Sequence, residues 1–183
     1  MSTVRSPALL GLAAESQAGR VASLHLHPLE GGAPMQSTEA IEVIAGKGIA
    51  GNARHFERRS RSTGERSRRQ ISLIEREQIA EHATALGLEQ IVPGAVRSNL
   101  ETSGVKLASF IGQDVQVGEA VLHFYAPRTP CAKMDAICAG LRELMQNGRQ
   151  GVMAEIIRSG KIRVGDLIQI VAPSPPPALD YQI

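Results

Sequence analysis

Cys131 lies in a segment whose residue types favour a reactive thiol. Residues 127–133 are Pro-Arg-Thr-Pro-Cys-Ala-Lys, so two prolines hold the backbone extended and Arg128 and Lys133 supply positive charge. A helix is predicted to begin shortly afterwards. Cationic neighbours and a helix N-terminus favour the thiolate, which is both a nucleophile and a soft ligand for a metal such as molybdenum. The alternative interpretation is a thiol that fills a loop.

The second cysteine, Cys138, is predicted to be structural. It lies near Leu141 and Met145 on the buried side of a predicted helix, where a thiol behaves as a small hydrophobe. The chain contains no C-x-x-C pair, so a dithiol redox motif is absent. Zinc is disfavoured as well, because no second ligand pair stands at a recognised spacing.

Positive charge is concentrated in residues 54–69. This segment holds seven arginines against two glutamates, which gives it +5, while the rest of the chain sums to −3 within a net charge of +2. Clustered guanidinium groups can hold a phosphate, although charge runs also form solvated loops. With three Phe, two Tyr and no Trp, the chain lacks the stacking platforms of a single-strand binder, which argues against a nucleic-acid partner.

A glycine pattern at residues 46–51 formally matches the dinucleotide fingerprint G-x-G-x-x-G. That fingerprint requires an apolar-faced helix to open at the last glycine. Residues 52–70 offer only Ala53 and Phe56 as apolar side chains, so a dinucleotide-binding oxidoreductase is a remote alternative. We predict instead a glycine turn that joins two strands and lets the backbone approach a ligand.

Three of the five histidines are candidates for a site. His25 and His27 point to the same side of a predicted strand, but two imidazoles do not complete a metal site, and a half-exposed strand face is the simpler interpretation. His55 follows the Gly51-Asn52 turn and opens the arginine segment. A ligand-facing role is therefore predicted for His55.

The elements that must position these residues are mainly short strands. Gly118-Glu119 and Ser159-Gly160-Lys161 are hairpin signals, and short strands linked in this way predict a closed or partly open β-barrel with a few helices. One helix is predicted after a capping box at residues 72–75 and ends at Gly87; a second runs from Met134 to Gly148. The predicted strands are 21–27, 40–45, 69–73, 115–117, 121–125, 152–158 and 167–171.

Length and composition predict one domain in a reducing compartment. At 183 residues and 43% hydrophobic content the chain can form its own core, and two cysteines are too few for a secreted disulfide framework. Residues 7–14 faintly resemble a signal core without continuation, and no run approaches the ~20 apolar residues of a membrane span. We expect a cytoplasmic protein with no membrane partner, divided into an extension (1–19), a barrel domain (20–172) and a Pro-rich tail (173–183).

Taken in order, these motifs resemble the MOSC domain family, named for the C-terminal domain of molybdenum-cofactor sulfurase. The stand-alone bacterial branch is the most similar, and the resemblance extends over about residues 20 to 171. The matching pieces are Gly48-Ile49-Ala50-Gly51-Asn52 with His55, Arg69-Gln70-Ile71-Ser72-Leu73-Ile74, Pro93-Gly94, Arg97-Ser98-Asn99-Leu100, Gly104-Val105-Lys106-Leu107, Gly112, Gly118, Pro130-Cys131 and Gly165-Asp166.

The resemblance implies a barrel like the pyruvate kinase barrel domain, with the cysteine beside a pocket. It implies that Cys131 either ligates molybdenum in the molybdenum cofactor (molybdopterin) or carries persulfide sulfur from a cysteine desulfurase. Pyridoxal phosphate would enter only through that desulfurase. Family relatives that hold the cofactor reduce N-hydroxylated bases, and this chain has no flavin, iron-sulfur or haem signature, so a reductase would need an external electron donor.

The same resemblance suggests a set of cofactor-binding residues. Arg97 has a guanidinium suited to the cofactor phosphate, and Asn99 has an amide suited to the pterin edge. The other expected contacts come from Asn52, His55, Arg128 and Lys133.

Two positions depart from the family pattern. The family usually has Asp where this chain has Asn52, and His55 stands one residue later than expected. A neutral amide cannot act as a base, although a structural turn role would tolerate Asn. A non-catalytic anion- or cofactor-binding module is therefore a further alternative.

Overall fold

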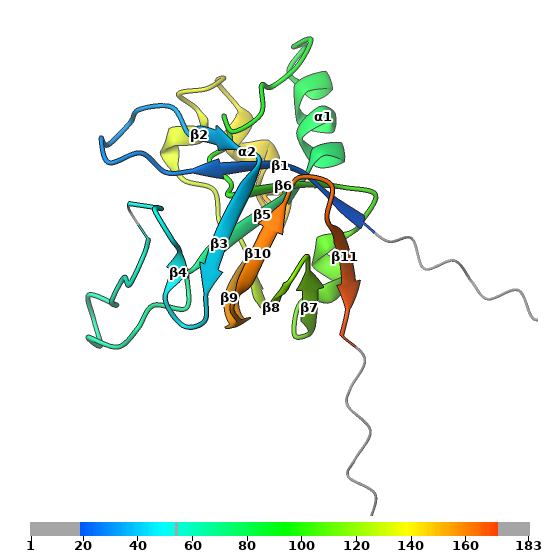
Figure 1. Ribbon diagram of the computed structural model, residues 1–183. Helices are drawn as coiled ribbons and strands as arrows, with labels where there is room; N and C mark the ends of the chain where they lie inside the picture. Colours follow the sequence, from blue (N-terminus) through cyan, green and yellow to red (C-terminus); the bar gives the residue numbers. More distant parts are fainter. Residues whose placement is uncertain (1–18, 54, 172–183) are drawn as a thin grey trace, which may run out of the picture.

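The computed structural model describes residues 19–53 and 55–171, which form a β-barrel with helical segments on its outside (Figure 1). The barrel strands are β1 (Gly19–Leu26), β5 (Ile71–Glu75), β6 (Leu100–Ser103), β7 (Asp114–Val117), β8 (Ala120–Pro127), β9 (Val152–Arg158) and β11 (Leu167–Ile170). Their hydrogen-bonded order is β11-β7-β8-β9-β5-β6-β1, and a β1–β11 pairing closes the ring. The mainly β prediction is confirmed, with the barrel closed.

Smaller elements complete the fold. Strand β2 (Gln36–Thr38) pairs with the second half of β1. A second sheet contains β10 (Gly160–Arg163), β3 (Ala40–Ile44) and β4 (Gly48–Ile49) in that order. Helix α1 (Arg76–Ala85) lies in the crossover between β5 and β6, which pair in parallel and therefore need a long connection. The remaining helical segments are η1 (Leu107–Phe110), η2 (Ala132–Met134) and α2 (Leu141–Leu144).

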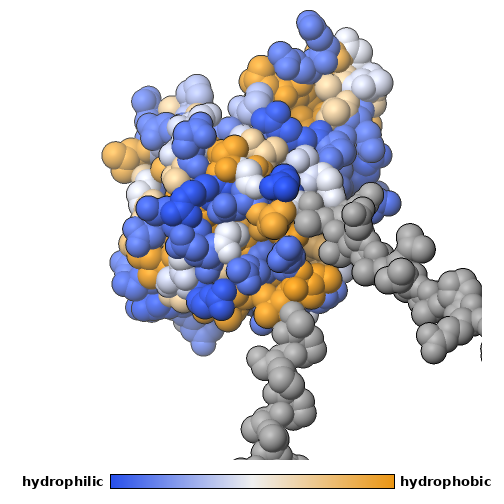
Figure 2. All heavy atoms as spheres, turned by 45° about the vertical axis from the view of Figure 1, so that its right-hand side comes forward, coloured by the Kyte–Doolittle hydropathy of each residue, from blue (hydrophilic) through white to orange (hydrophobic). Residues whose placement is uncertain are grey.

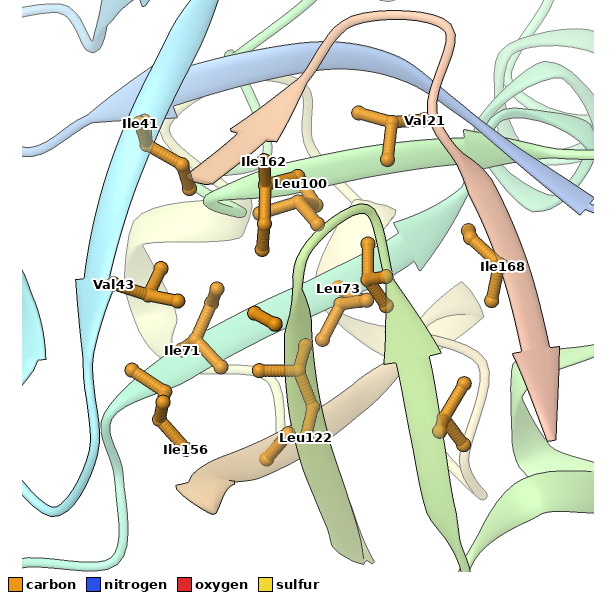
Figure 3. Packing of buried hydrophobic residues seen from close by; sticks show 14 of the residues in the cluster. Val21, Ile41, Val43, Ile71, Leu73, Leu100, Leu122, Ile156, Ile162 and Ile168 are labelled. Carbon is orange, nitrogen blue, oxygen red and sulfur yellow. The ribbon is translucent and has the colours of Figure 1, made fainter. Parts of the chain in front are cut away.

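The barrel interior is filled by aliphatic side chains from opposite walls. Figure 3 shows Leu73 and Leu100 facing Leu122 and Ile168, and the second sheet adds Ile162 from β10. Strand β7 alternates exposed and buried residues, as expected for a strand with one face on a core. Each aliphatic side chain buried here contributes about 1.5–3 kcal/mol to stability, so the barrel is a rigid base for residues at its ends.

All seven predicted strands are present, but four further strands escaped sequence analysis. Strands β2 and β4 have only three and two residues, and β10 has an isolated apolar residue, Ile162. Strand β6 has the sequence Leu-Glu-Thr-Ser, in which Glu101 and Thr102 are buried polar residues. A pattern of apolar residues cannot detect such strands, because their place in the fold is fixed by pairing with neighbours.

The predicted capping box at residues 72–75 is wrong. These residues belong to strand β5, and α1 begins afterwards at Arg76 without a side-chain cap from Glu75. The Ser72 hydroxyl donates instead to Oδ1 of Asn99, at 3.0 Å. Gly87, with φ of 67°, does follow the end of the helix as predicted.

The predicted continuous helix from Met134 to Gly148 is also wrong. Only the short segments η2 and α2 form, because Gly140 between them adopts a φ of 88°, which side-chain-bearing residues rarely adopt. The apolar residues are nonetheless buried. Met134 and Leu141 pack with Ile79 of α1 in a second core cluster, and Cys138 is half-buried against it.

The ends of the chain carry predictions that the structure leaves open. Residues 1–18 and 172–183 lie outside the described ranges, so the predicted extension, signal-like segment and tail stay predictions. Within residues 19–53 and 55–171, no helix has both the length and the apolar character needed to span a membrane. Figure 2 shows hydrophobic surface where the described residues end, and Ile170 and Val171 at the end of β11 are exposed.

Candidate functional site

A cavity of about 70 Å³ opens at one end of the barrel. Five strands reach it: β1 and β8 with their C-terminal ends, and β5, β6 and β9 with their N-terminal ends. The antiparallel pairs β1–β6 and β8–β9 bring these ends together. The lining residues are His27, His55, Arg69, Gln70, Ile71, Ser72, Arg97, Asn99, Arg128 and Met153.

Asn99 ties three of these elements together. Its Oδ1 accepts hydrogen bonds from the backbone nitrogen of Ser72 at 3.2 Å and from the Ser72 hydroxyl at 3.0 Å. Its Nδ2 donates to the carbonyl oxygen of His25 at 3.1 Å and lies 3.4 Å from Nδ1 of His27. Both amide atoms are thus engaged within the protein, so Asn99 holds the cavity wall in shape.

Asn52 acts behind the cavity on His27. Asn52 is fully buried, and its Oδ1 accepts a hydrogen bond from the backbone nitrogen of His27 at 2.7 Å and lies 3.2 Å from Nδ1 of that residue. The Nδ2 atom of Asn52 is buried without a hydrogen-bond partner among the described residues. Asn52 therefore fixes the position of His27, a role that needs an acceptor oxygen and no base.

His27 is a neutral imidazole in the cavity wall. Burial is the largest cause that lowers the pKa of His27 to about 3; the positive charges of His55, Arg97 and Arg128 act in the same direction, and the hydrogen bond to Asn52 opposes them. The rings of His27 and His55 meet edge to face, with 4.7 Å between centroids. The strand-face interpretation of His25 and His27 as half-exposed was wrong, because His25 and His27 are 1% and 8% exposed.

Arg128 is a half-buried cation of the cavity. Its Nη2 donates to the carbonyl oxygens of Val96 and Arg97, at 3.1 and 2.9 Å. The pKa of Arg128 is lowered to about 10, mainly by burial; negative charge at Cys131 opposes this, and the charges of Arg69 and Arg97 act in the same direction as burial. The guanidinium therefore stays charged at neutral pH, and its Nη1 is buried without a hydrogen-bond partner in the described structure.

The lining as a whole is positive and contains no carboxylate. Arg69, Arg97 and Arg128 are accompanied only by neutral polar, histidine and apolar residues. No group of three or more His, Cys, Asp or Glu side chains among residues 19–53 and 55–171 is placed to hold a metal ion. Guanidinium groups with no carboxylate among the other lining residues suit the phosphate of a cofactor, and about 70 Å³ admits such a group but not a whole pterin.

Cys131 lies beside the cavity and not in its wall. It is exposed and immediately precedes η2, which contains three residues, so the predicted helix after the cysteine is only a single turn. Negative charge on the Cys131 thiol would raise the pKa of Arg128, so the two groups are close enough to interact electrostatically. Of the two cations that the sequence predicted near Cys131, Arg128 is the one that also lines the cavity, and the effect of either on the thiol stays a prediction.

The other predicted residues fall into two groups. His55, Arg97, Asn99 and Arg128 all line the cavity, and Asn52 lies one contact behind it. Lys133 lines a separate, wider groove of about 490 Å³, which shares Arg97 with the cavity. Sequence analysis thus named residues from one region, although their roles as ligands stay predictions.

Sequence analysis missed four polar residues of the lining, of which Gln70 was named only within the family motif. His27 was assigned to a strand face, Ser72 to a helix cap, and Arg69 was named only within the arginine segment and a strand. Arg69 and Ser72 belong to the motif Arg69-Gln70-Ile71-Ser72, which marked the family resemblance. Strand parity provides no usable signal for His27, because the pairing of β1 with β6 shifts register between Val21 and Ser23 and both Leu24 and His25 are buried.

Comparisons with known proteins agree with this architecture. The YuaD protein from Bacillus subtilis has a TM-score of 0.71 and 19% identity, with 84% of this chain and 95% of that chain covered. YiiM from Escherichia coli has a TM-score of 0.61 and 19% identity, covering 84% and 70%, and YiiM from Geobacillus stearothermophilus has 0.66 and 17%, covering 84% and 75%. At these identities the likeness shows the fold alone.

A search among individually curated proteins gives no match to this chain. The family model of the MOSC domain matches residues 45–169, which is more than half of the sequence. That span includes the arginine segment, most of the cavity lining and Cys131. The chain therefore belongs to the MOSC domain family.

Proposed function

We propose that Cys131 is the reacting group of a protein that works in molybdenum-cofactor or sulfur-transfer chemistry, and that the adjacent cavity binds an anionic group of its cofactor. The observation that carries the proposal is Arg128. Arg128 lines the cavity, its Nη1 is buried without a hydrogen-bond partner among the described residues, and it stands three residues before the exposed Cys131 in the chain. One fixed cation thereby serves both a thiolate and an anion.

For the cofactor role, the chain's residues divide the work. Arg128, Arg97 and Arg69 would hold the phosphate in the cavity, and His55 would add a ring nitrogen at its edge. The Cys131 sulfur would ligate molybdenum, which supplies two-electron reduction of N-hydroxylated compounds when the cofactor is bound. The pterin body would lie outside the cavity, toward the exposed thiol, because the cavity is too small to contain it.

The exposure of Cys131 favours a second role as a sulfur carrier. In that reaction the Cys131 thiolate attacks the outer sulfur of a desulfurase persulfide, the sulfur–sulfur bond of the donor breaks, and the donor cysteine leaves as a thiolate. Cys131 then carries the persulfide, and no external oxidant or reductant is needed. A protein donor must reach the thiol, and Cys131 is accessible at the surface.

Cofactor loading separates the two roles. The wild type, Cys131→Ala, Arg97→Ala and the control Cys138→Ala would be made in a host that synthesises the cofactor, and molybdenum and pterin would be measured per chain. In the cofactor role, wild type and Cys138→Ala hold both, Cys131→Ala loses molybdenum, and Arg97→Ala weakens binding about ten- to a hundredfold because a charge-assisted contact is lost.

Transfer of labelled sulfur from a cysteine desulfurase completes the test. A carrier accepts label in wild type and Arg97→Ala but not in Cys131→Ala. If no variant holds molybdenum and wild type accepts sulfur, the carrier role stands alone. If wild type binds no molybdenum and accepts no sulfur, both roles are excluded. The protein would then be a non-catalytic anion-binding module.

A further inference from the structure

A groove of about 490 Å³ lies on the other side of Arg97 from the cavity. One wall is the turn that contains Val92 and Ala95, and the opposite wall follows Cys131 and contains Lys133 and Ile137. Met35, from the loop before β2, adds to the lining. Val92 and Ile137 are 57% and 38% exposed, so the groove presents apolar surface to a ligand from solvent.

The lining chemistry is selective. Apart from glycines, every residue of the groove is apolar except Arg97 and Lys133, and the lining contains no carboxylate and no neutral hydrogen-bonding side chain. A pterin, with several donors and acceptors along its edge, would find few partners there. An apolar body with one acidic group would match both features, because the apolar walls cover the body and Lys133 pairs with the acid.

The groove is held in shape by contacts behind it. The backbone nitrogen of Gly94 donates to Oε1 of Glu101 at 2.7 Å, and Glu101 is 1% exposed and pairs with Arg76 at 3.1 Å. Nη1 of Arg97 donates to the carbonyl oxygen of Ala33 at 3.0 Å, which ties the loop before β2 to the turn. A site that is formed before its ligand arrives spends less free energy on ordering.

We propose that this groove binds a small apolar organic anion, an aromatic or aliphatic carboxylate or sulfonate, with its acidic group at Lys133. The wall that carries Lys133 begins immediately after Cys131, so a bound molecule lies next to the reactive thiol. Only the expectation that the bound molecule takes part in chemistry at Cys131 rests on the proposed function; binding itself requires neither molybdenum nor Cys131.

The test uses 8-anilinonaphthalene-1-sulfonate as the anionic probe and N-phenyl-1-naphthylamine as a neutral probe with the same ring system. Fluorescence titration would be done on cofactor-free wild type, Lys133→Gln and Ile137→Asp, with Lys161→Gln, at an exposed position of strand β10, as the matched control. We expect Lys133→Gln to weaken the anionic probe about three- to tenfold, as for an exposed charge pair, and to leave the neutral probe unchanged. Ile137→Asp should weaken both probes, and Lys161→Gln should change neither.

Other outcomes overturn the inference. If wild type and Lys133→Gln bind the anionic probe with equal affinity, Lys133 does not contact its acidic group. If Lys133→Gln and Lys161→Gln lose the same affinity for the probe, the loss reflects the net charge of the protein and not a specific site. If the cofactor-loaded protein no longer binds the probe, the groove is the cofactor's own site. That result overturns the inference and leaves the proposed function unaffected. Probe binding that persists in Cys131→Ala supports a binding site in the groove, whether or not Cys131 is the reacting group.

Discussion

Nη2 of Arg128 donates a hydrogen bond to the carbonyl oxygen of Arg97 at 2.9 Å, so one half-buried cation fixes the backbone of another. Arg97 itself adopts a φ of 57°, which is uncommon for a residue with a side chain and costs backbone strain. The bond from Arg128 helps to hold that conformation. Like charges are brought together in this way, and an anion in the cavity would relieve their repulsion.

The first prediction concerns anion binding. Sulfate, a phosphate-sized probe, should raise the thermal midpoint of the wild type, because a ligand that binds only the folded state stabilises it by about 2.7 kcal/mol at a hundredfold excess over its dissociation constant. Arg128→Met should remove most of this increase. The exposed residue Arg158 offers a control, Arg158→Met, and equal sulfate shifts in all three proteins would contradict a specific site.

The second prediction concerns Asn52. Asn52→Ala leaves the backbone nitrogen of His27 buried without its acceptor, and should reduce the free energy of unfolding by about 1–3 kcal/mol in denaturant titrations. Asn52→Asp keeps the acceptor and adds a negative charge, which favours the imidazolium form. NMR titration should then place the pKa of His27 above the value of about 3 in the wild type, and an unchanged pKa would contradict the contact.

The third prediction follows from the low pKa of His27. Between pH 6.5 and about 3 the unfolded chain binds a proton at this residue and the folded chain does not, so stability falls as pH falls below 6.5. Burial also lowers the pKa of His25 and His82, which act in the same direction. The free energy of unfolding, measured from pH 7 to 5, should decline by as much as about 1.4 kcal/mol per pH unit for each such group.

His27→Gln should make that decline shallower. The half-exposed His123 provides the matched control, because His123→Gln removes an imidazole that lies outside the barrel core and faces Asp114. A wild-type slope unaltered by His27→Gln would mean that His27 is not protected from protonation by the fold.

The sequence predicted the barrel because its strands are short and apolar and are separated by glycine turns. These features are visible in neighbouring residues and do not depend on distant parts of the chain. The sequence could not predict β6, where Glu101 is buried because Arg76 and the Gly94 nitrogen reach it from distant parts of the chain. The same limit explains the false capping box. Ser72 has the residue type of a cap, but its hydroxyl meets Asn99, 27 residues further along the chain.

The candidate site was predicted in composition but not in arrangement. Local charge near Cys131 identified Arg128, and the family resemblance suggested Arg97, Asn99 and His55, which the barrel brings to one cavity. The separation of Lys133 into a neighbouring groove depends on Arg97 standing between the two spaces, and only the tertiary structure contains that information.

The central claim is that Cys131 is the reactive thiol and that Arg128 supports it. The most direct test is alkylation by iodoacetamide near neutral pH, followed by mass mapping of Cys131 and Cys138 in wild type, Arg128→Met and Arg158→Met. The account predicts faster labelling of Cys131 than of half-buried Cys138, and a slower rate at Cys131, but not at Cys138, in Arg128→Met alone. Labelling of Cys138 at least as fast as Cys131, or a Cys131 rate unaffected by Arg128→Met, would contradict it.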